Sequence, residues 1–517
     1  MKEFFGKERK TILLLLAAVF FAFLISYLSM KDNSIAFWFD QSRDAHLASK
    51  IIEDHDLKIL GPSASGTNDA VYHGVLYYYF LAPLYYFGHG NPMVPAMVLS
   101  FLGCLGIIPL YYFSKRFFSS TKIAWITVFG YVFSVEIIQL SSWLSNPSLA
   151  VVPLIIFYWS LWEVGFKNNK AFIIPLAISM GISLQAALWL IYLFGPLLVA
   201  LLYNYEHFSK KSVLRDWKSN IIFISIVFLL VSSILIGQLM LWKNGIFSLE
   251  GLGLSEKITN TSILIPLFKV YFSKIIQTIG PYTPVVAFLI LMASISGFTQ
   301  LPKNNRIFLI SWILGPFWLF LIEPRNSIHI LISLELAIIL ILSFQVTQIW
   351  QKKSFVSKLI AATLIGVYVF SNLMMFKNHK DTSSNIFSPQ QGTNLADQLS
   401  LIDYTYAKAS GGDFTFSAFT NPHGYYITWA YLYDWYGQKK YGYKPTFVGP
   451  NQSGLFGEEL LLRDDVSRAK IHFTIVEPDL EVLPQITRDL FIEEQNRLAP
   501  IVETKMFGST KIEFRPI

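Results

Sequence analysis

Long apolar runs separated by short polar turns dominate the first three quarters of this chain. A bilayer core of about 30 Å needs roughly 20 apolar residues in a helix. Runs near that length fall at about 11–30, 93–113, 123–141, 149–166, 171–186, 188–205, 221–242, 284–300, 307–322, 328–350 and 359–376. The pattern therefore predicts an α-helical polytopic membrane domain over residues 1–376, with about eleven transmembrane helices.

The composition of the chain agrees with this prediction. Of its 517 residues 53% are hydrophobic and only 15% are charged, whereas soluble domains have about 25% charged residues. The single cysteine, Cys104, lies in an apolar run, so an internal disulfide and a cysteine-based metal site are both excluded.

The distribution of basic residues predicts the orientation in the membrane, because cytoplasmic loops are enriched in Lys and Arg. With the N-terminus inside, the inner loops carry about twice as many Lys and Arg as the outer loops before residue 377. The inner set includes Lys115, Arg116, Lys122, Lys167, Lys170, Lys210, Lys211, Arg215 and Lys218. We therefore expect a multi-pass protein of the cell membrane with a cytoplasmic N-terminus. An odd number of spans places the region after the last span outside.

Two long outer loops follow from this topology, at 31–92 and 243–283. Within the first, the stretch 74–88 (GVLYYYFLAPLYYFG) is short, and its tyrosines suit the membrane–water interface. If it crossed the membrane, every later basic loop would change sides, so we expect an interfacial or re-entrant helix. The second loop contains IPLFKVYFSKIIQ, an amphipathic segment typical of a helix that lies along the membrane surface.

From about residue 377 the composition becomes that of a soluble domain. The apolar runs DFTFSAF, PTFVG, IHFTIVE and TKIEFRPI predict strands, and they alternate with helix-like segments that begin near residues 388 and 483. Residues 377–517 are thus expected to form an extracytoplasmic α/β domain. Acidic residues outnumber basic ones in this part of the chain, which argues against nucleic acid as a partner.

The first outer loop concentrates side chains that can carry chemistry, namely Asp40, Arg43, Asp44, Asp69 and His73. Helical spacing would place the first three on one face. Polar groups held beside a bilayer are costly, so a functional site is the hypothesis. Asp40 would act there as a general base on an acceptor hydroxyl. Alternatively, it would only cap the helix formed by DQSRDAHLASKII.

The remaining candidate residues each have two interpretations. In the first interpretation Arg43 would bind a phosphate through its planar fork, and Asp44 would orient Arg43 or a sugar hydroxyl. In the second, Arg43 and Asp44 would only form a solvated charged face. His73 would take part in the site or be an ordinary interfacial histidine. In the outer turn EPRNSIH, Arg325 and His329 would recognise an anionic headgroup or phosphate, unless Arg325 only extends toward the interface.

Several stretches together resemble a known superfamily. They are FDQSRDA, LKILGPSAS, HGVLYYYFLAPLYYFGHGNP and YYFSKRFF in the first part, EPRNSIHILISLELAII before a late span, and DWYGQKKYGYKP and FTIVEPD in the tail. With them the chain resembles the GT-C glycosyltransferases. Within that superfamily it is similar to the bacterial family thirty-nine proteins, relatives of protein O-mannosyltransferases and of the aminoarabinose transferase.

The resemblance implies an inverting transferase that moves a sugar from a polyprenyl-phosphate carrier to a lipid, glycan or protein acceptor on the outer face. By position, Asp40 matches the first-loop acidic residue to which a catalytic or acceptor-activating role is assigned. Arg43 and Asp44 match the RD that commonly follows, and His73 matches the histidine before the aromatic stretch. Metal dependence stays open, because oligosaccharyltransferase relatives use a divalent cation and other members do not.

The chain departs from the pattern of the superfamily at two positions. Val75 stands where a proline is usual, and Gln41 stands where the mannosyltransferases carry a second acid. A mechanism that uses a pair of acids is therefore not implied.

Two other functions remain open at this point, a transporter or flippase of lipid-linked saccharides and a ligase that acts on diphosphate-linked oligosaccharide. Transporters usually place polar residues deep within several spans. Here the predicted spans are largely apolar apart from Gln185, Gln238 and Glu335, and the polar groups gather on the outer side. This distribution favours chemistry at the surface over passage through the membrane.

Overall fold

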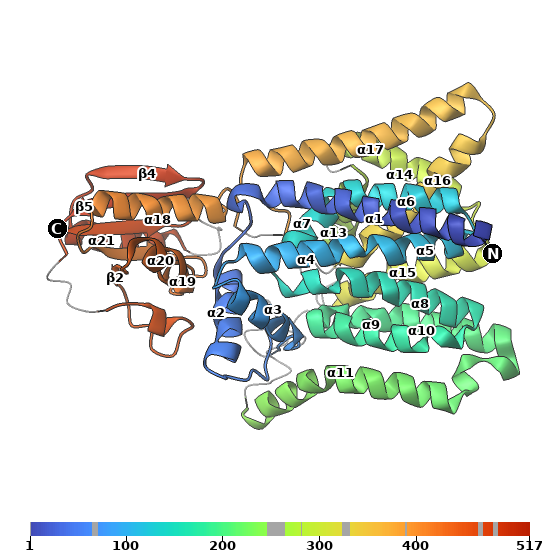
Figure 1. The fold of residues 1–517 in the computed structure, drawn as a ribbon, viewed down its shortest axis with the longest axis horizontal. Coiled ribbons are helices and arrows are strands. Elements are labelled where there is room, and N and C mark those ends of the chain that lie inside the picture. The colour runs from blue at the N-terminus through green and yellow to red at the C-terminus, as the bar shows by residue number, and fades with distance from the viewer. Residues whose placement is uncertain are drawn as a thin grey trace.

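A computed structural model describes residues 2–64, 71–245, 264–280, 282–322, 331–387, 390–463, 469–478 and 484–517. Most of the chain forms one bundle of long helices, and a small sheet with its own helices lies beyond one end of that bundle (Figure 1). The N-terminus lies at the other end of the bundle, far from the sheet (Figure 1). Helices α2 and α3 form a thin layer between the bundle and the sheet.

Helices occupy all eleven segments that the hydrophobic pattern predicts. They are α1 (Lys2–Met30), α4 (Met93–Leu105), α5 (Ile107–Phe118), α6 (Thr121–Phe133), α7 (Val135–Ser142), α8 (Val151–Lys167), α9 (Ile173–Ala186), α10 (Phe194–Phe208), α11 (Trp217–Lys243), α14 (Pro284–Phe298), α15 (Lys303–Ile322), α16 (Ile332–Gln351) and α17 (Phe355–Asp381). A further helix, α13 (Leu264–Ile279), lies in the predicted second outer loop.

The lengths of these helices decide which of them can cross a membrane. Within the described ranges, 7 helices are long and apolar enough to cross, some of them joined from two neighbouring elements. If α6 and α7, which are bent by 59° relative to each other, together form one span, the number of spanning helices rises to 8. Helices α9 and α14 are apolar but shorter. The protein is thus a multi-pass membrane protein, and the predicted number of about eleven spans stays a prediction.

The first outer loop folds into η1 (Lys31–Asn33), α2 (Phe39–Glu53) and α3 (Leu76–Phe87). With 12 residues α3 is about 18 Å long, too short to span a bilayer core. Its side chains Tyr77, Tyr78 and Tyr85 are buried, and α3 packs along α2. The prediction of a non-spanning helix here agrees with this geometry.

The amphipathic segment of the second outer loop forms α13, but it does not lie apart along a surface. It packs against α14, α15 and α16, and the side chain of Lys274 is buried within the bundle. The expected surface helix is therefore corrected to a packed one, in which Lys274 faces inward and pairs with Glu136.

The C-terminal part is a mixed α/β structure, as predicted. Its elements are α18 (Leu395–Ala409), β1 (Thr415–Phe419), α19 (Ile427–Leu432), η9 (Tyr433–Gln438), α20 (Lys439–Tyr441), β2 (Thr446–Phe447), η10 (Glu458–Leu460), β3 (Ile471–Val476), α21 (Gln485–Leu498), β4 (Glu503–Phe507) and β5 (Thr510–Pro516). The strand order is β2-β1-β3-β5-β4, parallel across the first three strands and antiparallel across the last three. Strand β4 escaped prediction because its sequence, ETKMF, is polar and mostly exposed.

The core of the C-terminal part continues into the first outer loop. Buried side chains of α2 and α3, such as Ala45 and Tyr85, belong to the same apolar cluster as Leu395, Trp429 and Tyr431. The backbone is joined as well, because the amide of Leu395 donates to the carbonyl of Ile35 at 2.9 Å. The layer of α2 and α3 is therefore held rigidly against the sheet.

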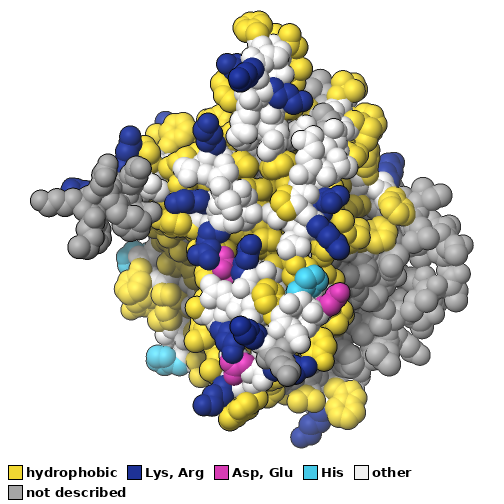
Figure 2. Space-filling model, turned by 90° about the vertical axis from the view of Figure 1, so that its right-hand side faces the viewer, with side chains coloured by type: hydrophobic (Ala, Val, Ile, Leu, Met, Phe, Trp, Pro, Cys, Tyr) yellow, Lys and Arg dark blue, Asp and Glu magenta, His cyan; other side chains and the backbone are white. Residues whose placement is uncertain are grey.

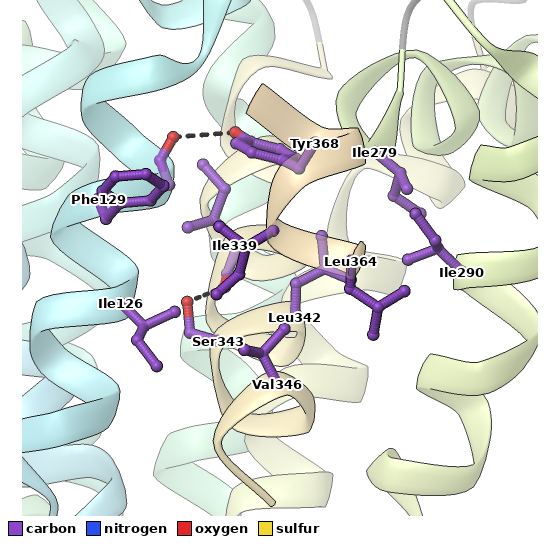
Figure 3. Close-up of a pocket in the computed structure, with 12 residues that line it drawn as sticks. Ile126, Phe129, Ile279, Ile290, Ile339, Leu342, Ser343, Val346, Leu364 and Tyr368 are labelled. Atoms are coloured by element: carbon purple, nitrogen blue, oxygen red, sulfur yellow. Dashed lines mark hydrogen bonds between the residues drawn. The ribbon is translucent and has the colours of Figure 1, made fainter. Parts of the chain in front are cut away.

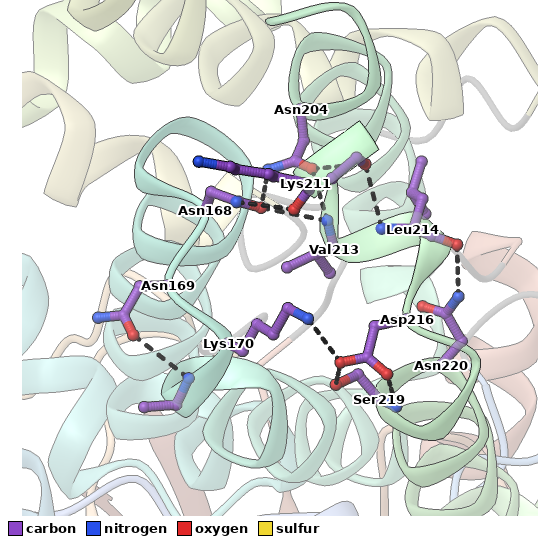
Figure 4. A network of polar contacts seen from close by, with 12 residues as sticks. Asn168, Asn169, Lys170, Asn204, Lys211, Val213, Leu214, Asp216, Ser219 and Asn220 are labelled. Atoms are coloured by element: carbon purple, nitrogen blue, oxygen red, sulfur yellow. Dashed lines mark hydrogen bonds and ion pairs between the residues drawn. The ribbon is translucent and has the colours of Figure 1, made fainter. Parts of the chain in front are cut away.

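The end of the bundle opposite the sheet is strongly basic. Figure 2 faces this end and shows many more Lys and Arg side chains than Asp or Glu. A polar network closes the turns between α8 and α11 there (Figure 4). Asn204 accepts a hydrogen bond from Ser212 at 2.8 Å, and Lys170 pairs with Asp216 at 2.7 Å. Asn204 also donates to the carbonyl of Val164 at 2.9 Å, which satisfies a backbone group at the end of α8.

Candidate functional site

Asp40 lies in the first turn of α2 and is not its N-cap. The cap position belongs to Trp38, whose amide donates to Oε1 of Gln41 at 3.0 Å. The alternative interpretation of Asp40 as a helix cap is therefore wrong. Its carboxylate is instead 55% exposed and makes an ion pair with Nη1 of Arg43 at 2.9 Å.

Arg43 connects two carboxylates from a buried position. Its Nε and Nη2 atoms donate to Oδ1 of Asp44 at 2.9 and 2.8 Å, while Nη1 reaches Asp40. Only 7% of Arg43 and 2% of Asp44 are exposed. Tyr78 of α3 donates its hydroxyl to the same oxygen of Asp44 at 3.3 Å. The interpretation of Arg43 and Asp44 as a solvated charged face is thus wrong, because both side chains are inside the protein.

The electrostatics of this cluster follow from its burial. Burial raises the pKa of Asp44 to about 6, although Arg43 opposes the shift, and the charge of Asp40 adds to it. For Arg43, burial works against the charged form, but Asp44 and Asp40 outweigh it and raise its pKa. Arg43 therefore stays charged and holds one buried and one exposed carboxylate, of which the exposed one can accept a proton from a ligand.

The C-terminal part of the chain fixes the position of α2. Ser42 and Thr428 share a hydrogen bond of 3.1 Å, and the rings of Phe39 and Tyr425 meet edge to face at 5.1 Å. Gln398 donates to the carbonyl of Phe37 at 2.7 Å, just before the helix. The sequence analysis did not detect these contributions, since they join residues more than 350 positions apart.

His73 lies at another junction. Its Nδ1 accepts a hydrogen bond from the amide of Leu188 at 2.9 Å, and its own amide donates to Pro62 at 2.8 Å. The segment is fixed further by Gly74, whose amide donates to the carbonyl of Gln185 at 3.0 Å. His73 thus joins the first outer loop to η4 (Leu188–Leu193).

Three other predicted residues, Asp69, Arg325 and His329, lie outside the residues that the structure describes. The structure therefore brings together Asp40, Arg43 and Asp44 of the predicted set. In the described ranges, no group of three His, Cys, Asp or Glu side chains is arranged to hold a metal ion.

A second charged cluster, which the sequence analysis missed, is buried in the bundle. Lys274 of α13 pairs with Glu136 of α7 and interacts electrostatically with Glu335 of α16, which accepts a hydrogen bond from Ser134. Thr278 donates to Glu136 at 3.3 Å. The signal in the sequence was Glu136 and Glu335 within predicted spans, since such residues are costly in lipid and seek partners. Lys274 was placed in the predicted second outer loop and gave no such signal.

The helical bundle also contains a small apolar pocket of about 50 Å³ between α6, α13, α14, α16 and α17 (Figure 3). Its described lining is aliphatic and aromatic apart from a few groups such as the hydroxyls of Ser343 and Tyr368. These hydroxyls donate to the carbonyls of Ile339 and Gly130 at 2.7 and 2.9 Å (Figure 3). Because both hydroxyls are engaged, the pocket offers little for chemistry, and the site on α2 remains the better candidate.

Comparison with known structures bears on the fold. The crystal structure of ArnT from Cupriavidus metallidurans bound to undecaprenyl phosphate matches with a TM-score of 0.55 and 9% sequence identity, over 98% of this chain and 98% of that chain. The chain has a GT-C fold. The archaeal oligosaccharyltransferase AglB from Archaeoglobus fulgidus, in complex with an inhibitory peptide and a dolichol-phosphate, has a TM-score of 0.43 and 11% identity, over 89% of this chain and 69% of that chain.

At the level of sequence, no protein-family model and no curated protein matches the chain. The GT-C fold agrees with the fold class that the sequence predicted. Membership of the superfamily and the finer assignment to family thirty-nine stay predictions. At 9% identity the likeness concerns the fold, so the function has to be argued from the site.

Proposed function

We propose that the protein is an inverting glycosyltransferase that moves a sugar from a polyprenyl-phosphate carrier to an acceptor hydroxyl on the outer face of the membrane. The observation that carries this proposal is the exposed carboxylate of Asp40, held by the buried Arg43 directly after the first membrane helix. The GT-C fold supports it, and the undecaprenyl phosphate bound to ArnT supports a lipid phosphate as the carrier.

In this reaction Asp40 takes the proton of the acceptor hydroxyl as general base. The acceptor oxygen forms a bond to the anomeric carbon from the side opposite the phosphate. The bond between that carbon and the phosphate oxygen breaks, and the polyprenyl phosphate leaves with the electron pair. Inversion at the anomeric carbon follows from this single displacement.

Arg43 acts as a positioning residue for Asp40. Its planar fork faces Asp44, so it is not free to hold a phosphate in the same bidentate way. The expectation that Arg43 binds the phosphate is therefore replaced by one in which it orients the base. Arg325, with His329 in the same turn, remains the proposed residue for the carrier phosphate, and His73 and Asp69 remain proposed substrate-binding residues.

The orientation in the membrane belongs to this proposal. The basic end of the bundle would face the cytoplasm, following the enrichment of Lys and Arg in inner loops. The C-terminal part lies at the other end of the bundle and would then be extracytoplasmic (Figure 1). A reporter fused after residue 400 should behave as external, and a cytoplasmic signal from it would contradict the orientation.

The test of the reaction is the Asp40→Asn variant, assayed in membranes for transfer of radiolabelled sugar from polyprenyl phosphate. Transfer should fall by roughly 10²–10⁴-fold, the usual cost of removing a placed base. Asp32→Asn, in the same loop and exposed, is the matched control and should keep wild-type transfer. Full transfer by Asp40→Asn would remove Asp40 from the mechanism.

A transporter or flippase of lipid-linked saccharides is the second proposal, because the cluster of Lys274, Glu136 and Glu335 lies inside the bundle. Against it, Lys274 also lies 5.7 Å from the ring of Phe387, beyond the outer end of α17. The cluster is thus near the outer end rather than along a path through the membrane. Translocation of a fluorescent lipid-linked saccharide in proteoliposomes, undiminished in Asp40→Asn, would favour transport.

A ligase acting on diphosphate-linked oligosaccharide would show transfer from that donor instead.

A further inference from the structure

A groove of about 790 Å³ lies between the layer of α2 and α3 and the C-terminal part. From α2 it is lined by His46, Ser49, Lys50 and Glu53, whose spacing marks one face of the helix. Asp40 lies on a different face of α2, near its other end. The groove is therefore a second hollow, separate from the carboxylate of the proposed reaction.

One wall of the groove is built by contacts between distant segments. The hydroxyl of Tyr431 donates to the carbonyl of Gly90 at 2.6 Å, and Lys439 donates to the carbonyl of His89. The ring of Trp435 lies so close to Gly90 that a Cβ there would be 2.7 Å from it, and the φ of Gly90 is +80°. These contacts lock the turn after α3 to η9, so the groove has a fixed shape.

The lining combines exposed aromatic rings with polar groups. Tyr86 is 48% and Phe87 is 76% exposed, and both line the groove together with Trp435. Ser49 and the carboxylate of Glu53 add hydrogen-bonding groups to the same lining. A sugar ring has an apolar face of C–H groups and an edge of hydroxyls, so an aromatic surface beside carboxylate and hydroxyl oxygens suits it.

The charges of the groove limit the kind of saccharide. Lys50 and His46 both pair with Glu459, and Lys439 is engaged by the backbone of His89. Acidic groups gather here, since Glu53, Asp54 and Asp434 all line the groove. Burial and the carboxylates of Asp54 and Asp434 raise the pKa of Glu53. With its cations engaged and its acids close together, the groove disfavours a phosphorylated or uronic saccharide.

We propose that this groove binds a neutral or amino saccharide as part of the acceptor. The inference rests on the proposed function, since a saccharide acceptor follows from a glycosyltransferase. The groove then holds one part of the acceptor chain away from Asp40, so the acceptor must be long enough to reach from the groove to Asp40. An acceptor without such a saccharide gains nothing from the groove.

The test measures binding of defined oligosaccharides to the full-length protein in nanodiscs by saturation-transfer NMR and titration. The probes are maltohexaose, a hexamer of glucosamine and hexagalacturonate. We expect maltohexaose or the glucosamine hexamer to bind, and hexagalacturonate to bind more weakly. Trp435→Ala should weaken this binding about tenfold or more, because it removes the largest aromatic ring of the lining.

Two further variants complete the design. Ser49→Trp fills the groove without removing a contact between the two parts of the chain, and it should weaken binding even if Trp435→Ala folds poorly. Trp217→Ala is the matched control, because Trp217 is exposed at the start of α11, far from the groove, and it should bind as the wild type.

Three results would overturn the proposal: no binding of either neutral or amino hexasaccharide, tighter binding of hexagalacturonate, or unchanged binding in both groove variants. Asp40→Asn separates this proposal from the proposed reaction. Loss of transfer with retained saccharide binding supports both. Normal transfer by Asp40→Asn with binding that depends on Trp435 would refute the reaction and leave a saccharide-binding groove.

Discussion

Two charged clusters of this protein have the same composition, two carboxylates and one cation, but different surroundings. In the cluster on α2, Arg43 and Asp44 are buried while the carboxylate of Asp40 is 55% exposed. In the cluster of the bundle, Lys274, Glu136 and Glu335 are all buried. A carboxylate that a substrate can reach, held by a buried cation, can do chemistry, whereas a fully enclosed set of charges mainly holds helices together.

The difference in surroundings also determines what a mutation in each cluster does to the protein. Removing one partner from a buried ion pair leaves an uncompensated charge in a medium that solvates it poorly. Asp40 is hydrated, so its removal leaves only the buried pair of Arg43 and Asp44, which still satisfies itself. We therefore expect mutations in the first cluster to affect the reaction and mutations in the second to affect stability.

The largest expected effect concerns the base itself. Asp40→Gly should lower transfer of radiolabelled sugar by roughly 10²–10⁴-fold, with an unfolding temperature close to that of the wild type. Added formate should restore part of the activity, because a small carboxylate can enter the space left by the side chain and take the proton. If formate has no effect on Asp40→Gly and stability has fallen, the first cluster is structural and the contrast disappears.

The next largest effect concerns the enclosed cluster. Lys274→Met leaves Glu136 and Glu335 buried without their cation and should lower the free energy of unfolding by about 3–5 kcal/mol. Thermal unfolding in nanodiscs measures it. The triple variant K274M/E136Q/E335Q removes all three charges together and should regain most of the stability. Wild-type stability of Lys274→Met combined with lost transfer would instead assign this lysine to the reaction.

The two clusters also show what a sequence can predict. The spacing of Asp40 and Arg43 was enough to predict that they share one face of a helix, because local periodicity fixes it. Glu136, Lys274 and Glu335 come from three segments far apart in the chain, and apolar patterns do not say which faces of which spans meet. The same limit hid the hydrogen bond between Ser42 and Thr428.

Whether a helix or strand was predicted depended on how clear the local sequence pattern is. The long helices and the strands β1, β2, β3 and β5 were predicted because each lies in an apolar run of characteristic length. Strand β4 and the turn-rich stretch around η9 contain no such run. The groove beside Trp435 was beyond prediction, since its aromatic residues also fit a domain core, and only their contact with Gly90 places them at its wall.

The smallest expected effect concerns the pH dependence of the first cluster. Burial raises the pKa of Asp44 from 3.8 in the unfolded chain to about 6, so folding favours its protonated form. Its contribution to the free energy of unfolding is then fully present below about pH 4 and is lost as the pH rises through about 6. The groups that face it are Arg43, Asp40 and Tyr78, and Arg43 limits the size of the effect.

Asp44→Asn should therefore flatten the stability profile between about pH 4 and pH 6 relative to the wild type, measured by thermal unfolding. Other titrating groups, such as Glu477 with a pKa of about 7, are the same in both proteins, so the difference between the two curves isolates Asp44. Asp32→Asn should leave the profile unchanged. If Asp44→Asn and wild type follow the same curve, folding does not shift the titration of Asp44, and the effect ascribed here to its burial is refuted.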